Sequence, residues 1–318
     1  MGDLPGARVN PSRPFSSVAV DYAGPFDIKD GKLRSRKIIK SYICLFVCQA
    51  VKAVHIEVVS DLTSDGFLSM LKRFVSRRGI PSNIYSDNAT CFVGGKNELV
   101  KLQNLTKSNG FDHYLSDNQI KWHFMPARSP HFGGLHEAAV KSCKHHLKRV
   151  LNRGLLHYEG FYTLTSQIEA ILNSRPLVSI FSDPNDSEVL TPAHFLMGQE
   201  LTAIPEVRHE TDSKVNFTSR YRYLQLIGQQ LWSRWRKEYL NTLQQRTKWQ
   251  FAVDPKMCVG RLVLMKEDNV STLHWPMARI IEVHPGRDNI VRVVTVQTNE
   301  GAFKREITKL CLIPMEGD

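Results

Sequence analysis

The sequence lacks the paired cysteines and histidines of a zinc module. Its six cysteines are scattered along 318 residues, and none forms a Cys-x-x-Cys pair. This spacing argues against a structural zinc site and a disulfide framework, and it favours buried free thiols. Cys44 and Cys48 are an even number of residues apart, so we expect them to share the core face of one strand.

Long hydrophobic runs and targeting signals are also missing. The longest apolar stretch, from Tyr42 to Val51, is interrupted by Gln49 and is too short to cross a bilayer. The N-terminus has neither the pattern of a secretory signal nor a convincing myristoylation start. We therefore expect an intracellular protein with no membrane partner.

The charge balance is strongly positive. Lys and Arg number 42 against 31 Asp and Glu, which gives a net charge of +11 and an isoelectric point of about 9.4. This favours an anionic partner such as nucleic acid or an acidic membrane surface, although a generically basic soluble protein fits the charge almost as well. The length suggests about two domains.

The first half of the chain alternates between strand and helix patterns. Residues 1–14 hold three prolines and predict a linker. Further on, the patterns predict strands at 17–22, 38–47, 51–59, 83–87 and 120–124, and helices at 63–78, 96–105, 161–173 and 193–197. This order predicts an α/β layer with a mixed sheet.

The second half changes character. Residues 199–216 are polar and irregular, and a long amphipathic helix is expected from about 217 to 249. Short strands separated by tight turns follow at 261–265, 278–283, 290–297 and 303–307. Such strands favour a small β domain.

Three acidic residues have settings that suit one task. Asp21 and Asp87 lie at the ends of short strand-like runs, and Glu137 opens a long helical pattern. Taken singly, each acid is better explained as a turn residue, a helix cap or a helix ion pair. Together, three carboxylates can hold Mg²⁺ or Mn²⁺, and two such ions form a phosphoryl-transfer site.

The sequence motifs around these acids resemble those of a known family. They occur in a fixed order, as Pro14-Phe15 to Val20-Asp21-Tyr22-Ala23-Gly24-Pro25, Ser86-Asp87-Asn88-Ala89-Thr90 with Phe92-Val93-Gly94, Pro126-Ala127 to Pro130-His131-Phe132-Gly133-Gly134-Leu135 before Glu137-Ala138-Ala139, Asn173-Ser174-Arg175-Pro176-Leu177, and Leu190-Thr191-Pro192-Ala193-His194-Phe195-Leu196-Met197-Gly198. The chain resembles the integrases of BEL/Pao-type LTR retrotransposons, within the superfamily of retroviral integrases and DDE transposases.

The resemblance implies a specific architecture. It implies a ribonuclease-H-like catalytic core with a mixed five-stranded sheet flanked by helices at residues 15–198. A helical connector at 199–250 and a small SH3-like β barrel at 251–318 would follow. Related integrases usually carry a His/Cys zinc module upstream, so the chain is expected to be a fragment or a truncated gene product.

The resemblance also implies a reaction. Processing of element DNA 3′ ends and strand transfer are phosphodiester transesterifications on double-stranded DNA, which require Mg²⁺ or Mn²⁺ and no ATP. Asp21 would bridge two ions, with Asp87 and Glu137 holding one each. We expect this polynucleotidyl transferase to act in the nucleus, as a homo-oligomer on DNA.

DNA contacts are expected beside the acids. Lys141, Lys144 and Lys148 follow Glu137 at helical spacing and could bind phosphates, although a solvated helix face is the plain alternative. His131 could contact an unpaired terminal base, and a hinge is equally compatible. Asn88 could orient DNA or cap a helix.

Two other functions remain open. A degenerate or domesticated integrase remnant would bind or tether nucleic acid without catalysis. A ribonuclease-H-type nuclease would hydrolyse DNA without joining it. The intact set of three acids favours integration, and the absent zinc module favours the remnant.

Overall fold

The computed structural model describes residues 6–30, 37–108, 120–125, 155–179, 189–206, 220–244, 257–268, 270–288 and 290–314. The chain forms two compact units, Met1–Asn173 and Ser174–Asp318. No helix within these described ranges is both long and apolar enough to cross a membrane.

The first unit is built on a five-stranded sheet with the strand order β3-β2-β1-β4-β5. Its strands are β1 (Ser17–Lys29), β2 (Ile38–Cys48), β3 (Val54–Val59), β4 (Asn83–Ser86) and β5 (Lys121–Phe124). Strand β2 is antiparallel to both β1 and β3, whereas β4 runs parallel to β1 and to β5. The predicted mixed sheet is therefore confirmed.

Strand β1 extends beyond the predicted 17–22. It continues to Lys29 through an irregularity in its pairing with β2 between Ala23 and Phe26. The sequence Gly24-Pro25 looked like the end of the strand because Pro cannot donate to a ladder. The irregularity accommodates it, since Gly24 has a φ of 139°, a conformation that glycine adopts readily.

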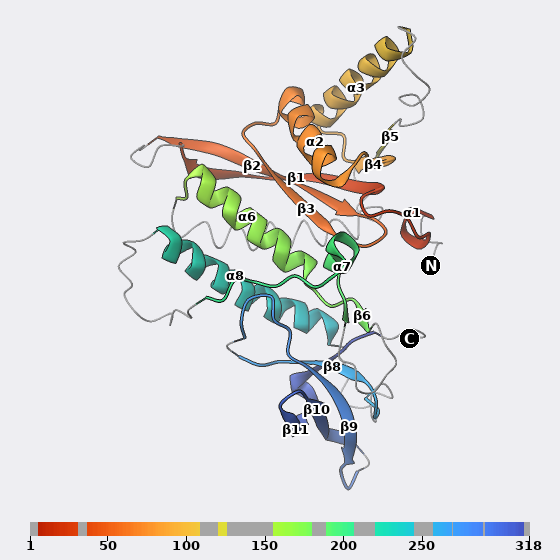
Figure 1. Cartoon of the computed structure of the whole chain (residues 1–318), viewed down its shortest axis with the longest axis vertical. Coiled ribbons are helices and arrows are strands. Elements are labelled where there is room, and N and C mark those ends of the chain that lie inside the picture. Colours follow the sequence, from red (N-terminus) through yellow and green to blue (C-terminus); the bar gives the residue numbers. More distant parts are fainter. Residues whose placement is uncertain are drawn as a thin grey trace. The chain divides into compact units, whose positions relative to one another are not determined.

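Helices cover both faces of this sheet. Helices α2 (Ser64–Arg78) and α3 (Thr90–Ser108) lie on one face, and α6 (Tyr158–Asn173) lies on the other (Figure 1). The ring of Phe46 on β2 stacks on Phe74 of α2, with centroids 4.0 Å apart. Phe26 of β1 meets Phe161 of α6, with centroids 5.7 Å apart. Apolar side chains therefore fill the interface between the sheet and the helices on each of its faces.

Helix α3 begins at Thr90, six residues before the predicted start at 96. Two glycines let it approach α2 closely. A Cβ atom at Gly95 would lie 2.5 Å from the Phe67 ring, and one at Gly94 would lie 2.0 Å from the Ser64 Oγ. The sequence Phe-Val-Gly-Gly therefore serves contact between two helices, because any larger residue would hold them apart.

The outer edge of β3 is closed by side chains. All six residues of this edge strand are buried. The Asn173 amide binds both Val54 N–H and Val54 C=O at 2.8 Å, Glu169 Oε2 accepts Ile56 N–H at 2.8 Å, and Arg73 Nη2 donates to Val58 C=O at 2.9 Å. These outward-facing backbone groups, which an edge strand usually leaves to solvent or to another chain, are satisfied from α2 and α6.

The segment predicted as a linker carries structure of its own. It contains the short helix α1 (Gly6–Val9). After it, Arg13 Nη1 donates to the Arg78 carbonyl at 2.7 Å and Nη2 donates to the Ile80 carbonyl at 2.6 Å. Arg13 therefore satisfies carbonyl groups at the C-terminal end of α2, where a helix leaves acceptors unpaired.

The second unit opens with a two-stranded ladder and a short capped helix. Strand β6 (Val178–Ser179) pairs with β7 (Val189–Leu190), and α7 (Pro192–Met197) follows. The Thr191 N–H donates to His194 Nδ1 at 3.1 Å. Gly198, with a φ of 78°, ends the helix by donating to the His194 carbonyl. The Leu-Thr-Pro-x-His motif thus contains the residues that begin the helix, and Gly198 ends it.

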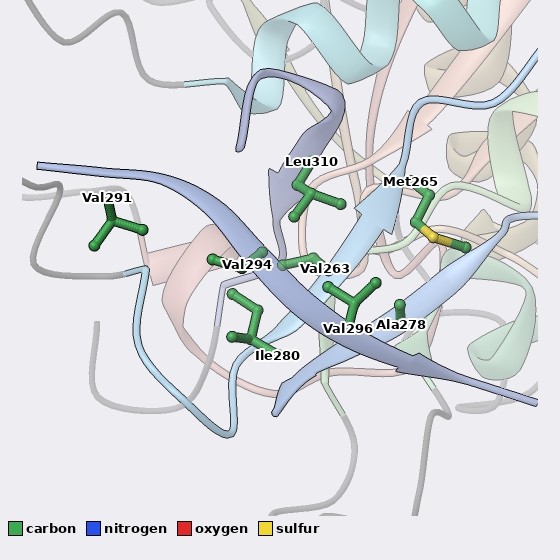
Figure 2. Packing of buried hydrophobic residues seen from close by; sticks show 8 residues of the cluster. All are labelled: Val263, Met265, Ala278, Ile280, Val291, Val294, Val296 and Leu310. Carbon is green, nitrogen blue, oxygen red and sulfur yellow. The ribbon is translucent and has the colours of Figure 1, made fainter. Parts of the chain in front are cut away.

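A five-stranded antiparallel sheet forms the C-terminal part, with the order β11-β10-β9-β8-β12. Its strands are β8 (Leu262–Met265), β9 (Met277–Pro285), β10 (Val291–Thr298), β11 (Gly301–Glu306) and β12 (Leu310–Leu312). One apolar cluster, formed by Val263, Met265, Ala278, Ile280, Val291, Val294, Val296 and Leu310, makes its core (Figure 2). The small β domain predicted from the short strands is present.

The helix predicted as a connector packs against this sheet. Trp275, which lies between β8 and β9, contacts the rings of Trp232, Trp235 and Tyr239 on α8 (Arg220–Leu243) at centroid distances of 5.1, 5.8 and 5.5 Å. Cys311 Sγ donates to the Leu240 carbonyl at 3.2 Å. Helix α8 and the sheet therefore share an aromatic core.

The cysteines largely follow expectation. Cys44, Cys48, Cys91 and Cys311 are buried free thiols. The prediction is wrong for Cys258, which is exposed and lies in an irregular segment before β8. Cys143 lies outside the described residues.

Candidate active site

Of the predicted acids, Asp21 lies within β1, and Asp87 directly follows β4, the strand that pairs with β1. In the parallel pairing of β1 with β4, Ala19 is the partner of Tyr85. Asp21 and Asp87 each lie two residues further along (19 + 2 and 85 + 2). The pairing ends at the row of Ala19 and Tyr85, so Asp21 lies one side-chain step beyond it on β1, and Asp87 is the first residue after the carboxyl end of β4.

Asp21 is held by its own strand. It is half-buried, and its Oδ1 accepts the N–H of Tyr22 at 2.7 Å. The Tyr22 ring stacks on Phe92 of α3, with centroids 5.1 Å apart and planes at 19°. This stack fixes the backbone beside Asp21 against the helix that follows Asp87.

The surroundings of Tyr22 are unusually apolar for a polar group. Its hydroxyl is buried and, among the described residues, finds no hydrogen-bond partner. Burial raises the pKa of Tyr22 well above its usual range, and the nearby Cys44 thiol adds to this. Burial likewise raises the pKa of Cys44, with the charge of Asp21 as the next cause. Neither group ionises near neutral pH.

Asp87 is exposed in the turn between β4 and α3. Its Oδ1 accepts the N–H of Ala89 at 3.0 Å, which is the pattern of an Asx turn. The neighbouring Asn88 donates from Nδ2 to the Met125 carbonyl at 3.3 Å. Asn88 thus connects the turn to the end of β5. Its predicted contact with DNA remains a prediction.

The other predicted site residues lie outside the described residues. These are the third acid Glu137, together with His131, Lys141, Lys144 and Lys148. Among the residues that the structure describes, no three His, Cys, Asp or Glu side chains gather closely enough to hold a metal ion. Asp21 and Asp87 offer carboxylate oxygens, the donors that Mg²⁺ and Mn²⁺ prefer, and so fit as part of a ligand set.

An aromatic pair on the same sheet escaped sequence analysis. The rings of Tyr85 on β4 and His123 on β5 stack with centroids 4.7 Å apart and planes at 15°. His123 is exposed, and its Nε2 lies 2.9 Å from Asn83 Oδ1. The alternation of the short strand at 120–124 was its only signal, because a cross-strand pair cannot be recognised without the register.

A buried charge cluster lies at the far edge of the sheet, on β3. His55 Nε2 lies 3.0 Å from Glu57 Oε1, and Nδ1 lies 3.2 Å from Glu169 Oε1. Three arginines of α2 surround the carboxylates, with Arg73 and Arg77 bound to Glu57 and Arg78 bound to Glu169. Every carboxylate is paired, so the cluster joins α2 and α6 to β3 and is no candidate for catalysis.

The pKa values in this cluster favour the charged forms. Burial alone would lower the pKa of His55, but hydrogen bonds to Glu169 and Glu57 outweigh it and raise the pKa. Burial would raise the pKa of Glu57 and Glu169, but hydrogen bonds to His55 outweigh it, and both pKa values fall. The cluster therefore functions as a set of ion pairs.

Comparison with known proteins gives limited matches. Residues 219–313, which hold α8 and the C-terminal sheet, match a family described as "Family of unknown function (DUF5641)". This is less than half of the chain. No curated protein matches the chain.

Solved structures show weak likenesses. One chain of the cryo-EM structure of the simian T-cell lymphotropic virus intasome in complex with PP2A regulatory subunit B56 gamma is 12% identical, with a TM-score of 0.38; the match covers 95% of this chain and 80% of that one. The catalytic core domain of BIV integrase is 16% identical, with a TM-score of 0.36, covering 58% of this chain and 95% of that one. At these scores neither likeness adds to what the sheet topology shows.

Proposed function

We propose that the chain is a retroelement integrase of the BEL/Pao type, which processes DNA 3′ ends and joins them to target DNA by transesterification. One observation supports the proposal: Asp21 on β1 and Asp87 after β4 each follow a residue of the paired row Ala19–Tyr85 by two positions. Five sequence motifs in the order typical of these integrases also support the proposal.

The roles of the acids follow from their surroundings. Asp21 is half-buried and Asp87 exposed, so a DNA backbone could reach both. With Glu137, they would hold two Mg²⁺ or Mn²⁺ ions, which supply charge stabilisation for the attacking and leaving oxygens. Asp21 and Asp87 would each contribute carboxylate oxygens to these ions, and the Asx turn at Asp87 uses only its Oδ1.

The rest of the chain would bind DNA and support assembly of an oligomer. Its net charge of +11 suits double-stranded DNA, and Lys141, Lys144 and Lys148 would bind phosphates beside Glu137. The second unit would correspond to the connector and SH3-like module of other integrases. We propose a homo-oligomer on DNA ends, acting in the nucleus.

A strand-transfer assay tests this function. The chain is incubated with Mg²⁺ or Mn²⁺, a labelled element-end duplex and a target plasmid. Joined product is expected, and Asp21→Asn or Asp87→Asn should lower its rate by about 100-fold or more, because each removes a charge at the reacting centre. Asp27→Asn, an exposed carboxylate on the same strand, is the matched control and should leave the rate unchanged.

The products separate the three functions. Nicked DNA without joined product indicates a nuclease. Binding without any cleavage, unchanged by Asp87→Asn, indicates a tethering remnant. Either result would overturn the proposed integrase activity.

A further inference from the structure

We propose that the exposed ring of His123, stacked on Tyr85, is a platform for an unpaired nucleobase next to the scissile phosphate. The inference deepens the proposed function and rests on it for the identity of the substrate. It assigns a substrate-positioning role to two strands that bear neither of the predicted carboxylates within their length.

The His123 ring is held in one orientation. Tyr85 supports one of its faces, with centroids 4.7 Å apart and planes at 15°. Asn83 Oδ1 accepts from Nε2 at 2.9 Å, which fixes the ring edge. Asn83 in turn donates from Nδ2 to Ser17 Oγ at 3.2 Å, on β1. A ring restrained on a face and an edge loses little entropy when a flat ligand stacks on it.

The platform lies on the same side of the sheet as Asp21. Ala19, Tyr85 and His123 occupy one row across three parallel strands. Side chains two residues apart on a strand share a face, so Asp21 lies on this face, one side-chain step along β1. Two residues of strand span about 7 Å, and the two strand spacings from β1 to β5 add about 10 Å across the sheet. A nucleotide one or two positions from a phosphate held at Asp21 and Asp87 could therefore reach the platform.

The two faces of the sheet are used differently at this point. Trp122 and Phe124 alternate with His123 on β5, and Trp122 packs on Phe67 and Phe92 from the helices of the opposite face. Lys121 and His123, which point the other way, are exposed. A buried ring would serve only packing, whereas an exposed ring with a fixed plane can accept a base.

The competing explanation is a cross-strand pair that only stabilises the sheet, an effect that aromatic neighbours on adjacent strands commonly have. The two explanations differ in a measurable way. A structural pair changes stability alone, whereas a platform changes the environment of a DNA base at the strand end.

Fluorescence of 2-aminopurine distinguishes them. The probe is a duplex with a short single-stranded overhang that carries 2-aminopurine, titrated with the full chain in EDTA so that no cleavage occurs. Stacking on His123 should quench the overhang base but not one placed inside the duplex. His123→Ala should remove this quenching and weaken binding about tenfold, within the range found for one stacked base.

Three variants control the measurement. His123→Phe keeps an aromatic plane and should restore quenching. His123→Gln keeps a polar group for Asn83 but no ring, and should behave as His123→Ala does, which covers a failure of the alanine variant to fold. Lys121→Ala removes an exposed charge from the same face of β5; it should lower the salt dependence of binding and leave quenching intact.

Equal quenching by the wild type and His123→Gln, no recovery with His123→Phe, or no quenching by the wild type would each overturn the platform. Loss of strand joining with quenching still dependent on the His123 ring would defeat the proposed enzymatic function and leave the platform standing.

Discussion

Asn173 makes two hydrogen bonds to a single residue, Val54. Its Oδ1 accepts the Val54 N–H and its Nδ2 donates to the Val54 carbonyl, both at 2.8 Å. Both residues are buried, 119 positions apart in the chain. The side-chain amide thus replaces the strand that would otherwise continue the sheet at β3.

Replacing Asn173 should destabilise the first unit strongly. Asn173→Ala leaves a buried N–H and a buried C=O without partners, which costs about 2–4 kcal/mol of unfolding free energy. Asn173→Asp keeps the acceptor and loses the donor, so it should also destabilise. Denaturant unfolding measures this, with the exposed Asn104→Ala as control. A loss no larger than that of the control would contradict the role of Asn173.

The two glycines of α3 should tolerate alanine unequally. A Cβ atom at Gly95 meets the fully buried Phe67 ring at 2.5 Å, whereas one at Gly94 meets the Ser64 hydroxyl, which can rotate away. Alanine gains about 1 kcal/mol of helix propensity at both sites, but overpacking a core ring costs about 1–3 kcal/mol. Thermal unfolding should therefore show Gly95→Ala as the less stable variant. Equal stability would show that α3 can move away from α2.

The stability of the first unit should fall as the pH rises past neutrality. The pKa of His55 is raised, so its contribution is complete below the unfolded value of about 6.5 and is lost as the pH rises through the folded value. The pKa values of Glu57 and Glu169 are lowered, so their contribution is present above about pH 4.5 and is lost on acidification.

Unfolding free energies measured from mildly acidic to mildly alkaline pH check this. His55→Gln should abolish the part of the slope that His55 causes, whereas the exposed His123→Gln should not. Arg78 Nε also lies 3.4 Å from His55 Nδ1, so its charge opposes protonation. A wild-type slope equal to that of His55→Gln would mean that His55 is neutral in the folded protein.

Trp275 should be essential to the second unit. Its ring contacts three aromatic side chains of α8, and it is buried. Trp275→Ala should cost about 3–5 kcal/mol and should expose α8 and the C-terminal sheet to protease together. Tyr221→Ala, an exposed aromatic on the same helix, is the control. Proteolysis of α8 alone would show that the helix is an independent connector.

Sequence patterns located the sheet and the acids because both depend on local signals. Alternating and β-branched runs predicted all five strands of the first sheet. Asp87 does follow a strand end as predicted, whereas Asp21 lies inside β1, which continues to Lys29. The pairing of β4 with β1 requires a crossover, and no local pattern contains it.

Tertiary contacts explain what the patterns missed. Asn173 was identified only as part of a family motif. Its hydrogen bonds to β3 were not predicted, because its partner Val54 is distant in sequence. Helix α3 was predicted to begin too late, since the residues after Asp87 carry no strong helix signal and owe their conformation to contact with α2. The docking of α8 was not predicted, because an apolar stripe does not say which surface it will cover.

Side-chain closure of β3 limits how this sheet can recruit another chain. A strand from a second molecule would have to displace an amide, a carboxylate and a guanidinium before it met a free backbone group at that border. Fibrous growth through this flank is thereby discouraged, and any association between copies of the chain would have to use helix surfaces or strands elsewhere.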